Sequence, residues 1–258
     1  MKLSNLQKQV KNISESIQMG RELTIEGTLY EQWGSRSLPW RIFLGLLQDC
    51  PHSDADAEEP TRVSWVKATK QHRKKWQDLE QSLSLKAIIA KNKVFNPLAP
   101  PSTKTDTKAT EEREMRDLIK TDVRRTLQEY DYFHQQSTKD LMAQILFLWG
   151  RENPDYGYKQ GMNEILAIIL IVFDSERVQS RDEQQSLDHW DNLSDEEIAK
   201  DHLTEFLFDP AHLKGDLYAC FDRVLQIGVK HLYMDTKDIT DLKNERSKRD
   251  TDEEKKRR

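Results

Sequence analysis

A run of nine consecutive apolar residues, 165–173, constrains this chain more than any other feature, because a segment without a polar face has to be buried in a core. Its length fits a helix or a strand, and the helical spacing of apolar residues in other segments favours a helix. A turn-forming stretch at residues 153–157 and a short polar stretch at 158–164 precede the run. That polar stretch is therefore anchored to the core.

The polar stretch contains the sequence Tyr158-Lys159-Gln160-Gly161. Taken alone, such a sequence more often marks a turn with a core tyrosine than a functional site. A glutamine anchored beside a core can nevertheless be held in one place, and an amide that orients a water molecule depends on such placement. Gln160 is therefore a candidate for a catalytic role, with Tyr158 as its support.

Composition excludes several classes of function. With 258 residues, 36% hydrophobic and 33% charged, the chain can bury a large core beneath a strongly polar surface. A net charge of −5 does not supply the broad cationic surface of a nonspecific nucleic-acid binder, so no nucleic-acid partner is expected. Cys50 and Cys220 lack the spacing of a metal site or a disulfide framework, which favours a reducing compartment such as the cytosol. The longest apolar run is about half of a bilayer span, so we expect no transmembrane segment and only peripheral membrane association.

Helical periodicity in most segments predicts an all-α fold. Residues 1–29 have the spacing of an amphipathic helix and are predicted to form an N-terminal helical extension. The first core helix is predicted at residues 36–47, with Trp40 on its apolar face. Trp65 and Trp76 are predicted core residues of the next helix, and Arg73 is assigned to its solvated face. Further core helices are predicted in the segments 111–127, 137–150, 194–207 and 210–225.

Residues 30–234 are predicted to form one domain with three loop insertions. The first insertion, near 49–61, is acidic and flanked by prolines, and the second, near 99–112, is rich in proline and then in Ser, Thr and Lys. The third, near 174–194, is acidic and is expected to be exposed to solvent. A charged tail, 235–258, follows the domain.

One predicted helix carries a charged pair beside its apolar stripe. Asp122 follows Ile119 by three residues, so its carboxylate falls beside the apolar face and requires a partner. Arg125 lies three residues further on, near the end of the helix, and is either a surface ion-pair partner of Asp122 or a functional cation. Arg36, just before the first core helix, is either a surface arginine or a structural cation. We expect Arg36 or Arg125 to compensate the carboxylate of Asp122.

Three motifs now stand in a fixed order, and their combination resembles the TBC domain, the all-helical domain of GTPase-activating proteins for Rab-family small GTPases. The resemblance covers roughly residues 30–234 and implies a multi-helix, all-α fold. The motifs are Arg36-x-x-x-Trp40, Ile119-x-x-Asp122-x-x-Arg125 and Tyr158-x-Gln160-Gly161.

The resemblance implies that Arg125 is an arginine finger, a side chain that reaches in trans to the phosphates of the partner's GTP. It implies that Gln160 is a glutamine finger, which orients the attacking water. Arg124 is the competing candidate for the arginine finger, but the register of the motif selects Arg125. The remaining motif residues would support the fingers, and Gly161 would permit close approach of another backbone.

The family also implies where the chemistry takes place. GTP and Mg²⁺ would belong to the partner, so the chain would need no cofactor or metal and would be a GTPase activator rather than an enzyme in its own right. A Rab-family GTPase is the implied partner. The implied setting is cytoplasmic, with recruitment to endosomal or other vesicle membranes during intracellular protein transport.

The resemblance weakens towards the C-terminus. The resemblance implies two helical subdomains in a full TBC domain, and the charged tail lies where further helices are expected. We therefore expect an N-terminal subdomain with at most part of the C-terminal one. Leu217, Phe221 and Leu225 would then be exposed for lack of packing partners. This expectation keeps open a second hypothesis, a non-catalytic binding or adaptor fragment.

Overall fold

The computed structural model describes residues 35–47, 58–92, 103–177 and 189–229, and every regular element in these ranges is helical. The predicted all-α fold is therefore confirmed for the described residues. The predicted N-terminal extension, 1–29, and the charged tail, 235–258, lie outside them. The elements are α4 (Ser37–Phe43), α5 (Glu58–Asn92), α6 (Thr103–Arg125), η1 (Asp131–His134), α7 (Gln136–Glu152), α8 (Met162–Ser175), α10 (Asp195–Glu197), η2 (Ile198–His202), α11 (Leu203–Leu207), η3 (Pro210–His212), α12 (Leu213–Val224) and η4 (Leu225–Val229).

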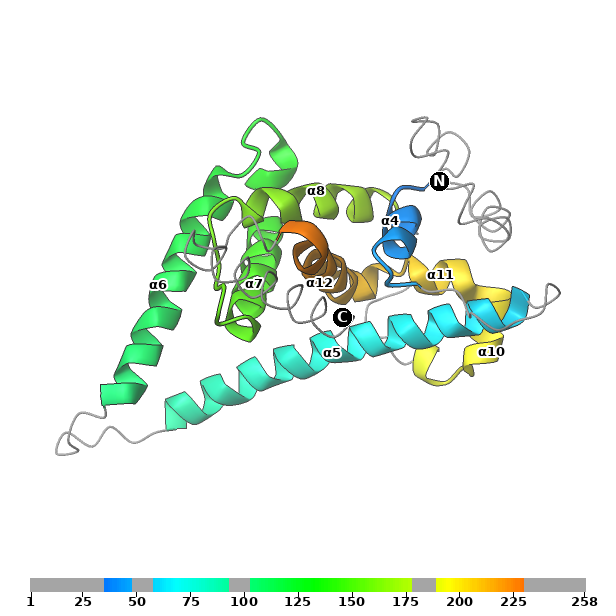
Figure 1. Ribbon diagram of the computed structural model, residues 1–258, viewed down its shortest axis with the longest axis horizontal. Helices are drawn as coiled ribbons and strands as arrows, with labels where there is room; N and C mark the ends of the chain where they lie inside the picture. Colours follow the sequence, from blue (N-terminus) through cyan, green and yellow to red (C-terminus); the bar gives the residue numbers. More distant parts are fainter. Residues whose placement is uncertain (1–34, 48–57, 93–102, 178–188, 230–258) are drawn as a thin grey trace, which may run out of the picture.

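Helix α12 lies at the centre of the arrangement and packs against α5, α7 and α8, while α6 packs along α7 (Figure 1). Side chains from α6, α7, α8 and α12, together with Trp76 of α5, form the main core. A second core joins α4 and the first part of α5 to η2 and α11, and it contains Trp65. Both tryptophans of α5 are buried, as the spacing predicted.

The apolar run at 165–173 is helical, as predicted, and forms most of α8. Apolar side chains at spacings of three and four converge on the main core, so one broad face of the helix is buried. Its buried residues are Met162, Asn163, Leu166, Ala167, Ile169, Leu170, Val172 and Phe173.

The prediction that Leu217, Phe221 and Leu225 are exposed is wrong. All three side chains are fully buried, because α12 occupies the middle of the bundle and is covered by α5, α7 and α8. The described helices thus supply the packing partners that we expected to be missing.

The boundaries of the three predicted insertions also need correction. Helix α5 already begins at Glu58, with Pro60 in its first turn, where the missing proline N–H requires no partner. Helix α6 begins at Thr103, two residues after Pro101, and runs through residues assigned to the second insertion. In the third, the described residues include the end of α8 and a buried tryptophan, Trp190, which packs in the second core. The prolines of the first two segments lie close to helix starts. The acidic composition of the third segment gave no indication of the core residue Trp190.

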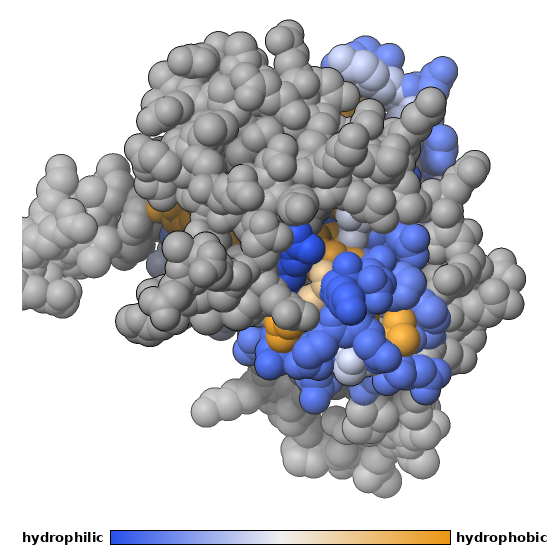
Figure 2. Space-filling view, turned by 90° about the vertical axis from the view of Figure 1, so that its right-hand side faces the viewer, coloured by the Kyte–Doolittle hydropathy of each residue, from blue (hydrophilic) through white to orange (hydrophobic). Residues whose placement is uncertain are grey.

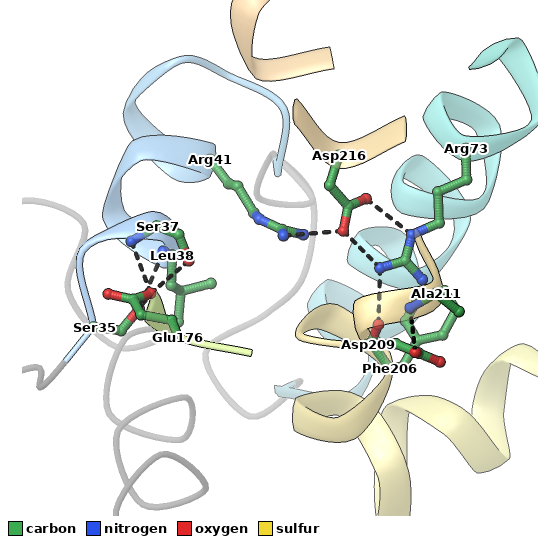
Figure 3. A network of polar contacts seen from close by, with 10 residues as sticks. All are labelled: Ser35, Ser37, Leu38, Arg41, Arg73, Glu176, Phe206, Asp209, Ala211 and Asp216. Carbon is green, nitrogen blue, oxygen red and sulfur yellow. Dashed lines mark hydrogen bonds and ion pairs between the residues drawn. The ribbon is translucent and has the colours of Figure 1, made fainter. Parts of the chain in front are cut away.

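A buried ionic network joins α4, α5 and α12. The guanidinium groups of Arg41 and Arg73 converge on the carboxylate of Asp216, at 3.1 Å for Arg41 Nη2 and 2.8 and 2.9 Å for Arg73 Nη2 and Nε (Figure 3). Arg73 Nη2 also donates to the carbonyl of Phe206 at 2.9 Å. Burial alone raises the pKa of Asp216, but the two arginines outweigh it and lower that pKa to about 2. The assignment of Arg73 to a solvated face was therefore wrong.

A second buried carboxylate, Glu176, lies at the C-terminal end of α8 and holds the start of α4. Its oxygens accept hydrogen bonds from the hydroxyl groups of Ser35 and Ser37 at 2.8 and 2.6 Å (Figure 3). They also accept the backbone N–H groups of Arg36 and Ser37. These donors satisfy the N–H groups at the beginning of α4, as a carboxylate does at a helix N-terminus.

Candidate functional site

The two residues proposed as fingers lie at the ends of two different helices. Arg125 is the last residue of α6, and Gln160 stands in the turn that leads into α8. Both side chains are exposed, and α6 and α8 contact each other. Arg124 is exposed as well, in agreement with the prediction that it is solvated.

The end of α6 is fixed by its buried face. Ile119 and Val123 belong to the main core, and Asp122, with 6% of its surface exposed, lies beside them as the spacing predicted. Thr126 is also buried, and its hydroxyl donates to the carbonyl oxygen of Asp122 at 3.0 Å. The chain then turns at Leu127, whose φ of 40° is rare for a residue other than glycine. Buried residues before and after Arg125 therefore fix the helix end from which its side chain projects.

Tyr158 is the partner of the buried carboxylate. Its hydroxyl oxygen lies 2.9 Å from Asp122 Oδ2 and 3.2 Å from Asn163 Oδ1. The hydrogen bond to Asp122 replaces the arginine compensation that we expected, since within the described residues no ion pair joins Asp122 to Arg125. A phenol can satisfy a carboxylate from inside the core, whereas Arg125 extends into solvent. Tyr158 thus supports the turn that carries Gln160.

Asn163 joins the two finger-bearing segments. Its Nδ2 donates to Thr126 Oγ1 at 2.8 Å, and its Oδ1 accepts the backbone N–H of Gly161 at 3.1 Å. One buried amide therefore connects the residue after Arg125 to the residue after Gln160. The sequence interpretation missed both Asn163 and Thr126. A polar amide at the start of a long apolar run was the available signal, because a buried polar group needs partners.

Gly161 is required by its conformation. Its φ is 95°, a left-handed value that costs an L side chain about 1–2 kcal/mol. It is the N-cap residue of α8, so the turn of Gln160 depends on it. A close backbone approach is found at Gly150 of α7, where an added Cβ would lie 3.2 Å from the backbone nitrogen of Tyr158.

Two carboxylates flank the site. Burial, followed by the nearby charge of Glu129, raises the pKa of Glu164, which lies in the first turn of α8. Glu129 belongs to the turn that follows α6, four residues after Arg125. Each of the two segments that Asn163 joins therefore carries an acidic side chain close to its candidate finger.

The first motif lies at the opposite end of α8. The backbone N–H of Arg36 donates to Glu176, at the C-terminal end of this helix, while Gln160 precedes its N-terminus. At about 1.5 Å per residue, the helix separates them by roughly 20 Å. Arg36 is exposed and Trp40 is half-buried against the main core. Arg36 therefore does not compensate Asp122, and its backbone N–H helps to hold the start of α4 at the end of α8.

Within the described ranges, no set of three His, Cys, Asp or Glu side chains is arranged to hold a metal ion. The described helices are also too short or too polar to cross a bilayer.

The sequence of this chain is similar to known proteins. The sequence profile of the Rab-GTPase-TBC domain matches residues 35–243. TBC1 domain family member 5 from Homo sapiens is 26% identical over 196 residues, which cover 74% of this chain and 22% of that protein. The Mus musculus protein of the same name is 26% identical over 197 residues, and TBC1 domain family member 5 homolog B from Dictyostelium discoideum is 26% identical over 192.

The chain thus matches about a fifth of the length of these relatives, and for the Dictyostelium protein 16%. No solved structure matches it. The profile covers nearly all of the described residues, including both helix ends that carry the candidate fingers. This chain therefore belongs to the Rab-GTPase-TBC domain family.

Proposed function

We propose that this chain is a GTPase-activating domain for a Rab-family small GTPase, and that it supplies Arg125 and Gln160 in trans. The observation that carries the proposal is the buried amide of Asn163, which ties the end of α6 to the turn before α8 at 2.8 and 3.1 Å. Two exposed side chains with complementary chemistry thereby extend from one rigid network.

The chemistry of GTP hydrolysis explains why these residue types are suited to the task. An isolated small GTPase is slow because charge that develops on the phosphate oxygens is poorly neutralised and the attacking water is poorly held. A guanidinium is planar and permanently charged, so Arg125 would stabilise the transition state at the phosphates. The amide of Gln160 would orient the water.

The surroundings of Arg125 support this role. Its side chain is exposed at a helix end, and in the part of the chain that the structure describes no carboxylate pairs with its guanidinium group. The alternative interpretation, a surface ion pair with Asp122, lacks support because the phenol of Tyr158 occupies that carboxylate. The guanidinium is available to an anionic partner.

GTP and Mg²⁺ would belong to the partner, and the chain would contribute side chains alone. We further propose that it acts in the cytoplasm and reaches endosomal or other vesicle membranes through its partners, in intracellular protein transport. Membership of the family supports this setting.

The test is single-turnover GTP hydrolysis by a panel of Rab-family GTPases, with the wild-type chain and with Arg125→Ala and Gln160→Ala. Stimulation by the wild type should be lost in both variants. Arg124→Ala and Lys159→Ala are matched controls, since each removes an exposed neighbouring side chain, and both should retain stimulation. Loss of stimulation in Arg124→Ala but not in Arg125→Ala would contradict the assignment of the arginine finger.

The adaptor hypothesis has lost its motivating expectation, because the apolar face of α12 is buried. Binding of the wild-type chain to GTP-loaded Rab-family GTPases, measured beside hydrolysis, tests this hypothesis. A wild-type chain that binds a GTP-loaded Rab tightly, yet stimulates no member of the panel, would support a binding module and overturn the proposed catalytic role.

A further inference from the structure

Helix α8 carries a second apolar stripe on its solvent side. Ile168 is 56% exposed and Ile171 is 39% exposed, although most of the other apolar residues of this helix are buried. Residues 164, 168, 171 and 175 follow one line along a helix, because their spacings are three and four. The side chain of Glu164 therefore lies on the same line as the two isoleucines, one turn before Ile168.

The exposed isoleucines of α8 can be compared with the face of the molecule that carries α10, α11 and the start of α5. Seen from the right-hand side of Figure 1, where α10, α11 and the start of α5 lie, the coloured surface is mainly hydrophilic, and its hydrophobic patches are small and separate (Figure 2). Among the described residues, the other large hydrophobic side chains that are exposed lie on different elements: Leu118, Tyr130 and Ile227.

The stripe is continuous with the site of the candidate fingers. It starts one turn after Gly161, and Asn163 Nδ2 donates to Glu164 Oε1 at 3.2 Å, so the bridging amide contacts both. Asn163 Nδ2 also donates to Thr126 Oγ1 at 2.8 Å, so the turn after α6, which contains Glu129, begins beside the start of the stripe. Burial and the charge of Glu129 both raise the pKa of Glu164. Tyr130, the next residue, is 54% exposed.

A partner placed over the fingers can cover this stripe as well. A stable protein interface buries about 800 Å² on each partner, which corresponds to a disc of roughly 16 Å radius. Ile168 and Ile171 lie about 10 and 15 Å along α8 from Gly161, at about 1.5 Å per residue. Both isoleucines therefore fall within the footprint of a partner centred on Arg125 and Gln160.

We propose that the Ile168–Ile171 stripe is a docking surface for the same small GTPase whose nucleotide the fingers reach. This inference rests on the proposed function. The GTPase places an apolar surface on the two isoleucines, and a basic side chain beside that surface pairs with the acidic rim formed by Glu129 and Glu164. The isoleucines determine affinity, while the fingers act on the chemical step.

The test is the dependence of stimulated GTP hydrolysis on the concentration of the GTPase, for the wild type, the Ile168→Asp/Ile171→Asp double variant and an Ile168→Leu/Ile171→Leu control. Two buried carboxylates against an apolar surface should raise KM at least about ten-fold, with a smaller effect on kcat. The leucine control should keep KM within about two-fold. Far-ultraviolet circular dichroism and thermal unfolding establish that each variant is folded, which is expected because both positions are exposed.

The outcomes separate the two proposals. Arg125→Ala should lower kcat with little effect on KM, so a wild type that stimulates, with an unchanged KM in the aspartate double variant, overturns the docking surface alone. If no Rab is stimulated, binding of the wild type and the double variant to GTP-loaded GTPase still decides the inference, and equal binding by both overturns it. A wild type that dimerises in sedimentation, with dimerisation lost in the double variant and KM unchanged, assigns the stripe to a second copy of this chain and also overturns it.

Discussion

Two polar networks lie in this molecule, and they differ in charge and in what they hold. At the site, the phenol of Tyr158 donates to one carboxylate, Asp122, and the amide of Asn163 joins Thr126 to Gly161, so the donors are neutral. Thr126 and Gly161 directly follow Arg125 and Gln160, whose side chains are exposed. Between α4, α5 and α12, two arginines and one aspartate form a fully buried ionic cluster with no exposed end.

The difference separates two tasks. Removal of a buried carboxylate from between two cations strongly destabilises the fold, because the two positive charges are left without a counter-ion. A network of neutral groups contributes less to stability but fixes direction, since each amide or hydroxyl accepts only a narrow range of geometries. Changes in the ionic cluster should therefore alter folding, and changes in the neutral network should alter activity.

The largest expected effect comes from Arg125→Ala, which tests the activity side of this comparison. Loss of an arginine finger lowers the stimulated rate by about 10³- to 10⁵-fold, or roughly 4–7 kcal/mol of activation free energy. The free energy of unfolding should change by less than about 0.5 kcal/mol, because the side chain is exposed. Single-turnover hydrolysis and urea unfolding measure the two quantities. Arg125→Lys, which keeps the charge but loses the planar fork, should recover only part of the rate.

The next effect concerns the ionic cluster. Asp216→Asn leaves the guanidinium groups of Arg41 and Arg73 buried without a carboxylate, and should lower the free energy of unfolding by about 3–5 kcal/mol. Asp195→Asn is the control. It makes the same replacement of a carboxylate by an amide in the more exposed ion pair with Lys70, and should cost at most about 1 kcal/mol. Equal losses of stability in urea unfolding would remove the distinction between the networks.

Acid should weaken the ionic cluster selectively. The pKa of Asp216 is lowered from 3.8 to about 2 in the folded chain, so its contribution is complete above about pH 4 and is lost as pH falls towards 2. This loss is about 2 kcal/mol. His212, whose pKa burial and Arg73 lower to about 4, adds acid sensitivity between about pH 6.5 and 4. Unfolding free energies of wild type and Asp216→Asn should converge by about 2 kcal/mol between pH 4 and 2. A constant difference would contradict the assignment.

A smaller effect on activity is expected in the network at the site. Asn163→Ala removes the acceptor of the Gly161 N–H and the donor to Thr126 Oγ1, at a cost of about 1–2 kcal/mol in unfolding free energy. Misplaced fingers should lower kcat for GTP hydrolysis about 10- to 100-fold, more than this loss of stability explains at a temperature where the protein is folded. Asn163→Asp keeps the acceptor for Gly161 but loses the donor to Thr126, so it should retain part of the activity. A kcat equal to that of wild type would show that Asn163 is structural only.

Local pattern sufficed for much of the fold. The helical character of residues 165–173, the buried tryptophans of α5 and the position of Asp122 beside an apolar face all follow from spacing within one element. The candidate fingers came from the resemblance to a family, and their roles stay predictions.

The missed residues share a physical cause. Arg73 has the sequence environment of a solvated cation, and its buried partners, the carboxylate of Asp216 and the carbonyl of Phe206, lie 143 and 133 residues away. Glu176 lies in an acidic segment and is distinguished by donors 139–141 residues earlier. Asn163 bonds to Thr126 across 37 residues. A buried polar group is defined by its partner, and periodicity within one helix contains no information about partners so far away.

The long separation within the ionic cluster has a consequence for the timing of folding. Arg41 and Asp216 are 175 residues apart, so at about 5–20 residues per second a ribosome adds Asp216 roughly 10–35 s after Arg41. Asp122 and Tyr158 are separated by only 36 residues, or roughly 2–7 s of synthesis. The finger-bearing segments can therefore acquire their mutual contacts while Arg41 and Arg73 still await their counter-ion, and the nascent chain has to keep these two arginines hydrated until α12 emerges.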